Sequence, residues 1–289
     1  MTQPSHYRSV FAAGLFAHRV VLVTGGGSGI GRCTAHELAA LGAHVVLIGR
    51  KLDKLHTVAG EIVADGGRAS FHSCDIREEA AVENTVEAIV LVHGRIDGLV
   101  NNAGGQYRAG LETISTKGFE AVVKNNLTGG FIFMREVFNR WMKDHGGSIV
   151  NIIADISNGW PMFGHSAAAR GGMLTLSESA ACEWASSGVR VNALAPGSIA
   201  SSGFDVYSPE NWAEVKKVAA KVPMQRFGNE AEVSAGIVFL LSPAASYVTG
   251  SCLRIDGGSP NARATFELQP HDRAPPPFDG FHRAKPTRT

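Results

Sequence analysis

Residues Val20–Gly31 read VVLVTGGGSGIG, an apolar run of strand length followed by a threonine and a turn dense in glycine. Gly25, Gly29 and Gly31 let the backbone turn tightly and approach a pyrophosphate, which then meets the N-terminus of the next helix. Glycine spacing by itself is a weak signal, and an ordinary loop is the competing interpretation. Placed between an apolar strand and a helical stretch, the spacing predicts a dinucleotide-binding turn.

Short runs rich in Val and Ile alternate with amphipathic stretches of helical length along the chain. The expected strands are Val20–Thr24, Val45–Ile48, Ala69–Ser73, Gly98–Val100, Ser148–Ile153, Val189–Leu194 and Cys252–Ile255. The expected helices are Gly31–Leu41, Lys54–Asp65, Glu78–His93, Phe119–His145, Ala167–Ser187 and Asn229–Leu241. Strands that are apolar on both faces are typical of a parallel sheet covered by helices. The pattern predicts an α/β protein with a single-domain, Rossmann-type doubly wound parallel sheet and helices on both faces.

The texture of the sequence divides the chain into three parts. We expect an N-terminal arm over residues 1–15, a Rossmann-type domain over residues 16–258 and a C-terminal tail over residues 259–289. From Pro260 onward the sequence is rich in proline and arginine and lacks periodicity. Such a composition is typical of a segment that is extended over the surface or disordered.

Bulk composition narrows the classes of function. The chain has 289 residues, 44% of them hydrophobic, and a formal net charge of +1. So balanced a charge favours neither nucleic acid nor an anionic membrane as a partner, and no apolar run is long enough to cross a bilayer. The spacing of His and Cys does not suggest a metal site.

The cysteines and the chain ends bear on the compartment. Cys33, Cys74, Cys182 and Cys252 lie far apart, and we expect reduced, mostly buried thiols of an intracellular protein. Residues 1–18 do not resemble a secretion signal, and Thr287–Thr289 is not a peroxisomal address. We therefore expect a cytoplasmic protein.

Charged residues after the second and third strands bear on the choice of cofactor. Arg50 and Lys51 stand where an Asp or Glu would accept a hydrogen bond from the ribose of NAD. Two cations suit the 2′-phosphate of NADP instead, although a solvated surface pair is the alternative. Asp75, followed by Ile76, is placed either to accept from the adenine amino group or to cap the next helix. The expected cofactor is NADP(H).

Together, these pieces resemble the short-chain dehydrogenase/reductase family over nearly all of residues 16–258. The matching motifs are Thr24–Gly31, Asp75, Asn101–Gly104, Asn126–Gly129, Pro196–Gly197 and Asp256–Gly258. The resemblance implies that Asn126 supports the active site and that the segment after Pro196 covers the nicotinamide. The cofactor contacts that it implies are Gly25, Gly27, Ser28, Gly29, Ile30, Asp75, Ile76, Asn102, Ala103, Gly104, Pro196, Gly197, the Ile199 backbone and Ser201.

The family's catalytic Ser, Tyr and Lys are all replaced in this chain. With Pro161 and Gly172 as anchors, Ser166 falls at the Tyr position and Arg170 at the Lys position. The Ser position falls on Ile153 or Ala154, so that hydroxyl is missing. These three replacements put ketone or alcohol chemistry in question.

Within the family, the resemblance is greatest to 2-enoyl- and 2,4-dienoyl-CoA reductases, especially the peroxisomal trans-2-enoyl-CoA reductase type. It is carried by Asn101–Tyr107, Trp141–Ser148, His165–Ser166 with Ala169–Arg170, Glu183–Ala185 and Leu241–Ser246. It implies an NADPH-dependent oxidoreductase of fatty acid metabolism that acts on the CH–CH bond of an acyl-CoA. It also implies a homotetramer formed through the two long helices, and a lid over Phe204–Pro223 that carries Trp212.

Loss of the Tyr changes which reaction the site supports. Reduction of a ketone needs an acid tuned to near neutrality, whereas hydride addition to a conjugated thioester gives an enolate that needs only good hydrogen-bond donors. Ser166, a water supported by Asn126, or Arg170 can be such a donor. The alternatives are a helix N-cap for Ser166 and a pair with a surface carboxylate for Arg170, whose expected role is to bind the nicotinamide ribose.

The source of the proton is open at this point. His165 is a candidate proton shuttle or a structural histidine, and Tyr107 is a candidate acid or an apolar wall residue. Asp155 is expected to cap a loop. Trp160, Phe163 and Phe204 are expected to shape an apolar acyl pocket or simply to pack.

Two other functions are compatible with the sequence. One is a carbonyl reductase or alcohol dehydrogenase that takes its acid from His165 or Tyr107. The other is a non-catalytic NADP-binding subunit that assembles with a partner. The intact glycine turn and the retained Asn126 favour an enzyme, although binding alone would also retain the turn.

Overall fold

A computed structural model describes residues 6–201, 217–262 and 265–284 of the chain. Within these ranges, seven parallel strands form one sheet in the order β3-β2-β1-β4-β5-β6-β9. Their bounds are β1 (Val20–Thr24), β2 (His44–Gly49), β3 (Arg68–Ser73), β4 (Gly98–Asn101), β5 (Gly147–Ile152), β6 (Val189–Pro196) and β9 (Cys252–Ile255). A separate short pairing joins β7 (Ile199–Ala200) to β8 (Gly228–Asn229).

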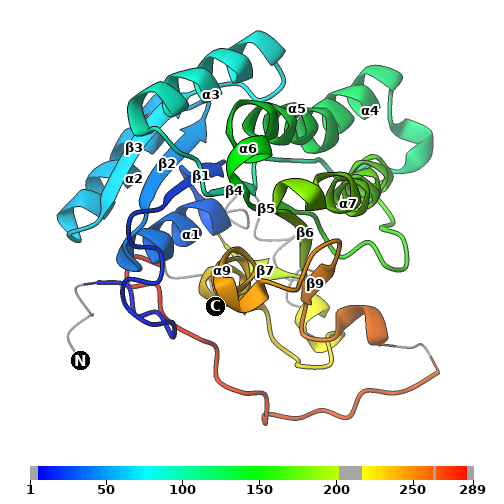
Figure 1. Ribbon diagram of the computed structural model, residues 1–289. Helices are drawn as coiled ribbons and strands as arrows, with labels where there is room; N and C mark the ends of the chain where they lie inside the picture. Colours follow the sequence, from blue (N-terminus) through cyan, green and yellow to red (C-terminus); the bar gives the residue numbers. More distant parts are fainter. Residues whose placement is uncertain (1–5, 202–216, 263–264, 285–289) are drawn as a thin grey trace.

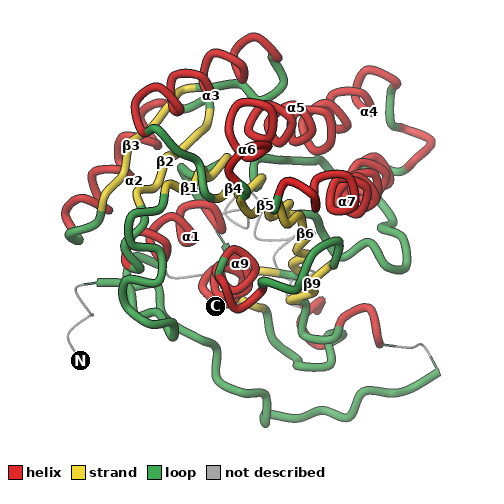
Figure 2. The backbone as a smooth tube through the Cα atoms, viewed as in Figure 1, coloured by secondary structure: helices red, strands yellow, loops and turns green. Residues whose placement is uncertain are grey.

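Helices cover both faces of the sheet (Figure 1 and Figure 2). One face is packed by α1 (Gly29–Ala40), α2 (Leu52–Ala64) and α9 (Glu230–Leu241), and the other by α3 (Glu79–His93), α5 (Gly129–Val137) and α7 (Gly164–Trp184). Both faces of the central strands are therefore apolar, as β1 shows with all five of its residues buried. The predicted doubly wound α/β fold is confirmed.

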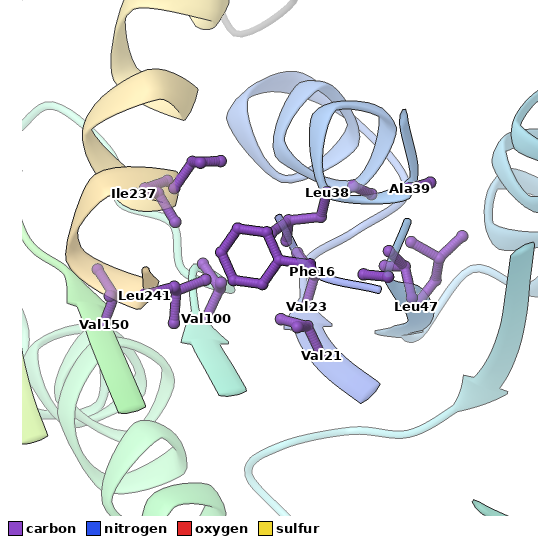
Figure 3. Packing of buried hydrophobic residues seen from close by; sticks show 14 of the residues in the cluster. Phe16, Val21, Val23, Leu38, Ala39, Leu47, Val100, Val150, Ile237 and Leu241 are labelled. Atoms are coloured by element: carbon purple, nitrogen blue, oxygen red, sulfur yellow. The ribbon is translucent and has the colours of Figure 1, made fainter. Parts of the chain in front are cut away.

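Phe16, just ahead of β1, fills the space between α1, α9 and the sheet (Figure 3). Its side chain is 2% exposed and belongs to the same buried cluster as Val23 of β1, Leu38 of α1 and Ile237 of α9. Burying an aromatic ring of this size stabilises the fold by about 2–3 kcal/mol. The cluster holds α1, and with it the glycine turn, in a fixed position over the sheet.

The segment expected as one helix over Phe119–His145 is divided into several pieces. These are α4 (Thr116–Val123), η2 (Lys124–Thr128), α5, η3 (Phe138–Met142) and α6 (Lys143–His145). Both η2 and η3 are π-helical turns, which are wider than an α-helical turn and are frequent at functional sites. η2 carries Asn126.

The remaining short elements are η1 (Leu111–Thr113), η4 (Ala185–Ser187), η6 (Pro243–Ala245) and η7 (Ser259–Asn261). Among the described helices, none combines the length and the apolar character that a membrane span requires. All four cysteines are free, and only Cys33 and Cys74 are buried. The expectation of mostly buried thiols is wrong for Cys182, on the outer side of α7, and for Cys252, on the edge strand β9.

The C-terminal tail over residues 265–284 lies against the rest of the molecule without helix or strand. Figure 1 shows it running from the region of β9 past α9 toward α1 and the N-terminal arm. Phe281, near its end, is 3% exposed and packs with Tyr7 of the arm, Cys33 of α1 and Ala231 of α9. Of the two states expected for this tail, the described part adopts the extended one.

Candidate active site

The sequence-predicted site residues gather at one edge of the sheet. The strand order reverses between β1 and β4, and in open α/β sheets ligands bind outside the carboxyl ends of the strands at such a point. The glycine turn follows β1, Asn102–Gly104 follow β4, and Ile153 follows β5. One crevice therefore receives the ends of three strands.

Thr24 fixes the glycine turn against the end of β4. Its hydroxyl donates to the Val100 carbonyl over 3.3 Å and accepts from the backbone amides of Asn102 and Ala103, each over 3.0 Å. The side-chain amide of Asn102 donates to the Thr24 carbonyl over 3.0 Å. These bonds hold the two loops side by side at the switch point.

Backbone conformation and lack of space both require glycine in this turn. Gly25 and Gly29 have φ angles of +67° and +55°, where a side chain is strained. A Cβ on Gly31 would lie only 2.5 Å from the Gly25 carbonyl oxygen. The Ser28 side chain does not cap α1, which leaves the first backbone amides of the helix for an anion. The turn, in which Gly27 and Ile30 also lie, fits a bound pyrophosphate.

The charged residues after β2 and β3 surround Asp75. Arg50 and Lys51 are exposed, and Lys51 is the N-cap residue of α2. Arg77 donates to both carboxylate oxygens of Asp75 over 2.6–3.2 Å. These bonds, with the nearby charge of Arg50, lower the pKa of Asp75 to about 2. The N-cap residue of α3 is Glu78, so the helix-cap interpretation of Asp75 is wrong.

An adenine amino group at this place would share the Asp75 carboxylate with Arg77. Ile76, the neighbouring residue that is expected to contact the cofactor, is 6% exposed and belongs to the core cluster that contains β2 residues. Its side chain also approaches Gly129 closely, since a Cβ there would lie 2.8 Å from Ile76 Cγ1. Packing therefore fixes the backbone on which Asp75 stands.

Asn126 and Arg170 meet at Gly104 in the loop after β4. The Asn126 side chain accepts from the Gly105 amide over 3.0 Å and donates to the Gly105 and Val122 carbonyls over 2.7 and 2.8 Å. A Cβ on Gly104 would collide with Arg170 Nη2 and would lie 2.6 Å from Asn126 Oδ1. Only glycine at position 104 lets both side chains reach the loop.

Arg170 is buried, and among the described residues it forms no ion pair with a carboxylate. Its Nη1 donates to the Ile152 carbonyl at the end of β5, and its Nε has no partner among the described residues. Burial lowers its pKa to about 10, so it remains a cation at neutral pH. The alternative of a pair with a surface carboxylate is wrong. A buried guanidinium with an unused donor is costly unless a ligand or water completes its bonds.

Ser166 precedes Arg170 by one helical turn and lies on the same face of α7. The helix begins at Gly164 with Phe163 as its N-cap residue, so the N-cap interpretation of Ser166 is wrong. The Ser166 side chain is fully buried, and its hydroxyl has no partner in the described part of the chain. Ser166 and Arg170, one helical turn apart, thus each hold one polar atom without a partner among the described residues.

His165 and Tyr107 form an edge-to-face pair beside these residues, with ring centroids 4.5 Å apart. His165 is fully buried, and both of its ring nitrogens lack a hydrogen-bond partner within the described ranges. Tyr107 is 43% exposed, and its hydroxyl lies so close to Gly118 of α4 that a Cβ there would collide with it. Tyr107 therefore covers His165 with its ring and directs its hydroxyl toward α4.

The loop between β5 and α7 carries three further candidate residues, Asp155, Trp160 and Phe163. Asp155 accepts from the Ser157 amide over 3.4 Å, as expected of a loop cap. Trp160 and Phe163 are half-buried, and their ring centroids lie 4.8 Å apart. Met162 has a φ of +69°, and its carbonyl accepts from the Ala109 amide over 2.9 Å.

The remaining cofactor contacts that were expected follow β6. Pro196 ends the strand, and a Cβ on Gly197 would lie 2.7 Å from Asp256 Cα. Ile199 is 8% exposed in β7, and Ser201 is the last described residue before the gap. The residues expected for the lid, including Phe204 and Trp212, lie mainly in residues 202–216, outside the described part.

A cavity of about 490 Å³ lies beside Ile199. Its other lining residues include Val222, Met224, Arg226 and Asp256, from the base of the expected lid and the end of β9. Sequence reasoning did not find this cavity, the positive φ angles of Met162 and Gln225, or the role of Thr24. The Asn229-x-x-Glu232 capping box that opens α9 does have a sequence signal. Among the described residues, no cluster of His, Cys, Asp or Glu is arranged to hold a metal.

Known proteins that are similar to this chain span several activities. A family model described as "Enoyl-(Acyl carrier protein) reductase" matches residues 25–259. A citronellol catabolism dehydrogenase (AtuB) of Pseudomonas aeruginosa PAO1 has 55% sequence identity and a TM-score of 0.80, covering 88% of this chain and 99% of that one. A peroxisomal 2,4-dienoyl-CoA reductase of Danio rerio is 35% identical over 88% of this chain and 85% of that protein. A glucose 1-dehydrogenase of Gluconobacter oxydans is 36% identical over 84% and 92%.

The doubly wound sheet and the glycine turn at the switch point have the form of a dinucleotide-binding site, and the family model and the relatives identify the chain as an oxidoreductase. The chain belongs to the short-chain dehydrogenase/reductase family, and its relatives include 2,4-dienoyl-CoA reductases. The resemblance of the sequence to this family is thereby confirmed.

Proposed function

We propose that this chain is an NADPH-dependent reductase of a conjugated enoyl-CoA or dienoyl-CoA thioester. The observation that carries the proposal is the pair Ser166 and Arg170. Both are buried, each has a polar atom without a partner in the described ranges, and they replace the family's Tyr and Lys. Unsatisfied buried donors are expected where a ligand supplies the missing acceptor.

The charges around the nucleotide end support NADPH over NADH. Arg50 and Lys51 are both exposed at the end of β2, where a 2′-phosphate would meet two cations. When bound, the reduced nicotinamide supplies the hydride of the reaction. The expected cofactor contacts from Gly25 to Ser201 form part of this proposal.

Ser166 and Arg170 suit a substrate whose negative charge spreads into an enolate. The Ser166 hydroxyl can donate to the thioester oxygen, and Arg170 places a permanent cation next to the ribose and that oxygen. Asn126 holds the Gly105 backbone by two hydrogen bonds and so fixes the loop that Arg170 approaches at Gly104. Neither Ser nor Arg is an acid tuned to near neutrality, which a ketone oxygen would need at once. The proton on carbon can arrive later, from His165 or from water.

The apolar wall supports an acyl substrate. Trp160 and Phe163 pack against each other just before α7, and the ring of Tyr107 packs on His165, the residue before Ser166. An acyl chain would bury apolar area there, and each methylene removed from water contributes about 0.8 kcal/mol.

A second candidate is the oxidation of an alcohol or the reduction of a carbonyl. It is favoured by the names of two relatives, the 55%-identical citronellol catabolism dehydrogenase and the glucose 1-dehydrogenase. In that case His165 or Tyr107 would have to supply the acid that Ser166 cannot. A methyl-branched chain, as in citronellol, belongs in the substrate panel under both proposals.

Turnover of NADPH by the purified protein separates these functions. The panel contains straight and methyl-branched 2-enoyl-CoA, 2,4-dienoyl-CoA, citronellal and glucose, with citronellol and NADP tested in the opposite direction. We expect turnover of the conjugated thioesters and about a hundredfold lower kcat/KM with the carbonyl compounds. Robust turnover of citronellal or citronellol alone would overturn the lead proposal, and tight NADPH binding without any turnover would indicate a binding subunit.

We also infer that the chain forms a homotetramer through α5 and α7. Ala167, Ala168 and Gly171 on α7 are small enough for a second backbone to approach, and Phe131 of α5 is 37% exposed. Light scattering during size-exclusion chromatography tests this. A monomer at micromolar concentration would contradict it.

A further inference from the structure

Gln225 occupies a strained position at the base of the expected lid. Its φ is +48°, a conformation that residues other than glycine adopt at an energetic cost. Strain of this kind persists only where the surrounding structure enforces it. The two sides of Gln225 belong to the cavity beside Ile199, because Met224 and Arg226 both line it.

The C-terminal tail holds this position by three hydrogen bonds. The Gln225 side-chain amide donates to the Gln269 carbonyl over 2.8 Å and accepts from the His271 amide over 3.1 Å. The His271 ring, through Nε2, donates to the Pro223 carbonyl over 2.8 Å. The tail is therefore bonded to Pro223 and to Gln225, on both sides of Met224.

The middle of the tail is tied to the start of α9. The Asn229 side chain caps α9 by accepting from the Glu232 amide over 2.9 Å, and it also donates to the Phe278 carbonyl over 2.9 Å. Glu232 in turn pairs with Arg226 over 2.6 Å. One network of hydrogen bonds therefore links the tail, the N-cap residue Asn229 and Arg226, which lines the cavity.

The far end of the tail is anchored on the cofactor side of the molecule. Phe281 is buried, and the Arg32 guanidinium of α1 lies 5.0 Å over its ring. Arg283 donates to both oxygens of Asp65 over 2.6 and 2.9 Å, and the Arg8 amide donates to the Gly280 carbonyl over 3.0 Å. The anchor is a buried aromatic ring with a bidentate ion pair, which is much stronger than a solvated contact.

We propose that the tail over residues 265–284 is a strap that sets the shape of the cavity beside Ile199, that this cavity receives part of the substrate, and that Gln225 and His271 are the positioning residues of the strap. The strap runs from its anchor on α1 to Pro223 and Gln225, so it fixes Val222 and Met224 relative to the helix that receives the cofactor. This assignment rests on the proposed function for its substrate, but not for its mechanical claim.

Three substitutions test the positioning role. Gln225→Ala removes two of the bonds, and His271→Ala removes the bond to Pro223. His271→Gln retains a donor at the place of Nε2. Each lost bond is worth about 1 kcal/mol, or about a fivefold change. We expect KM for the acyl-CoA to rise up to about twenty-five-fold in Gln225→Ala and about fivefold in His271→Ala, with kcat and the NADPH dissociation constant unchanged, and to recover in His271→Gln.

Gln269→Ala is the matched control, since Gln225 uses only the backbone carbonyl of Gln269. Its KM should equal that of the wild type. Trypsin cleavage after the exposed Lys221 gives a readout that needs no turnover. It should be faster in Gln225→Ala and His271→Ala than in Gln269→Ala. Unchanged KM and unchanged cleavage in the Ala variants would overturn the strap. If no acyl-CoA is turned over by the wild type, the proposed function fails while the cleavage rates still decide the strap.

Discussion

The Ser166 hydroxyl has no hydrogen-bond partner among the described residues, whereas the hydroxyl of Ser177, on the same helix, both accepts and donates a hydrogen bond. Ser177 accepts from Asn151 over 2.8 Å and donates to the Met173 carbonyl over 2.7 Å. Both hydroxyls are buried. We therefore expect the Ser166 hydroxyl to bind a ligand and the Ser177 hydroxyl to stabilise the fold.

Ser166→Ala should leave thermal stability unchanged and lower kcat/KM for an enoyl-CoA about tenfold, because its hydroxyl is used only when substrate is bound. Ser177→Ala should lower the free energy of unfolding by about 1–2 kcal/mol and leave kcat nearly unchanged. Thermal melts and steady-state kinetics of the two variants check this. The reverse pattern would place Ser166 in the structural core and not in the chemistry.

Arg170→Met should lower kcat/KM for the thioester about a hundredfold, since it removes the buried cation from the site. Arg170→Lys is the matched control that keeps the charge, and we expect it to stay within about tenfold of the wild type. Fluorescence titration with NADPH shows whether the loss lies in cofactor binding or in turnover. Full activity of Arg170→Met would remove Arg170 from the mechanism.

The glycine turn and the first turn of helix α1 pack so closely that they act as one element. A Cβ on Gly31 would collide with the Gly25 carbonyl oxygen, whereas a Cβ on Gly60, on the outer face of α2, would lie in open space. The same substitution should therefore have opposite effects at the two sites.

Gly31→Ala should destabilise the fold by about 1–3 kcal/mol and weaken NADPH binding by more than tenfold, since its Cβ meets the Gly25 carbonyl. Gly60→Ala should raise the free energy of unfolding by up to about 1 kcal/mol and leave NADPH binding alone. Urea titration and calorimetric binding measure both. Equal behaviour of the two variants would show that the turn is not sterically tight.

The sequence predicted regular elements well where one face must be apolar. β1 and β9 coincide with the expected Val20–Thr24 and Cys252–Ile255. The sequence did not predict the π-helical turn that carries Asn126, because apolar periodicity does not show the hydrogen-bond register of a helix. The start of α7 at Gly164 also escaped, since Phe163 is an N-cap residue without a capping side chain.

Contacts between distant segments were beyond the sequence. The positions of Asn126 and Arg170 followed from their motifs, but their meeting at Gly104 depends on the loop after β4. Likewise, nothing in the composition of the tail indicated that Phe281 would be buried against α1. Phe266, Leu268, Phe278 and Phe281 follow no regular period in this Pro-rich segment, so the sequence does not show which of them is buried.

The half-buried His44 and the buried His36 make the stability of the folded protein depend on pH. His44 of β2 bonds to Ser70 of β3 over 3.0 Å and lies 4.5 Å from the His93 ring. Burial, with the neighbouring His93 and Arg68, lowers the pKa of His44 to about 4. Burial also lowers the pKa of His36 on α1 to about 4.

The unfolded chain therefore binds protons before the folded one as the pH falls. The stability is complete above the ordinary histidine pKa of 6.5 and is lost as the pH falls from there toward about 4. His44→Gln keeps a polar partner for Ser70 and does not titrate. Its melting temperature should fall less between about pH 7.5 and about pH 5 than that of the wild type. Parallel curves for the two proteins would remove His44 from this dependence.

In the proposed reaction, the hydride is delivered to a carbon–carbon double bond conjugated with a thioester. Incubating the enzyme with 4-deuterated NADPH and a 2-enoyl- or 2,4-dienoyl-CoA, followed by NMR of the product, locates the transferred atom. We expect deuterium on a carbon of the former double-bond system, with the thioester intact. Deuterium on a carbinol carbon of a carbonyl substrate, with none transferred to any conjugated thioester, would contradict it.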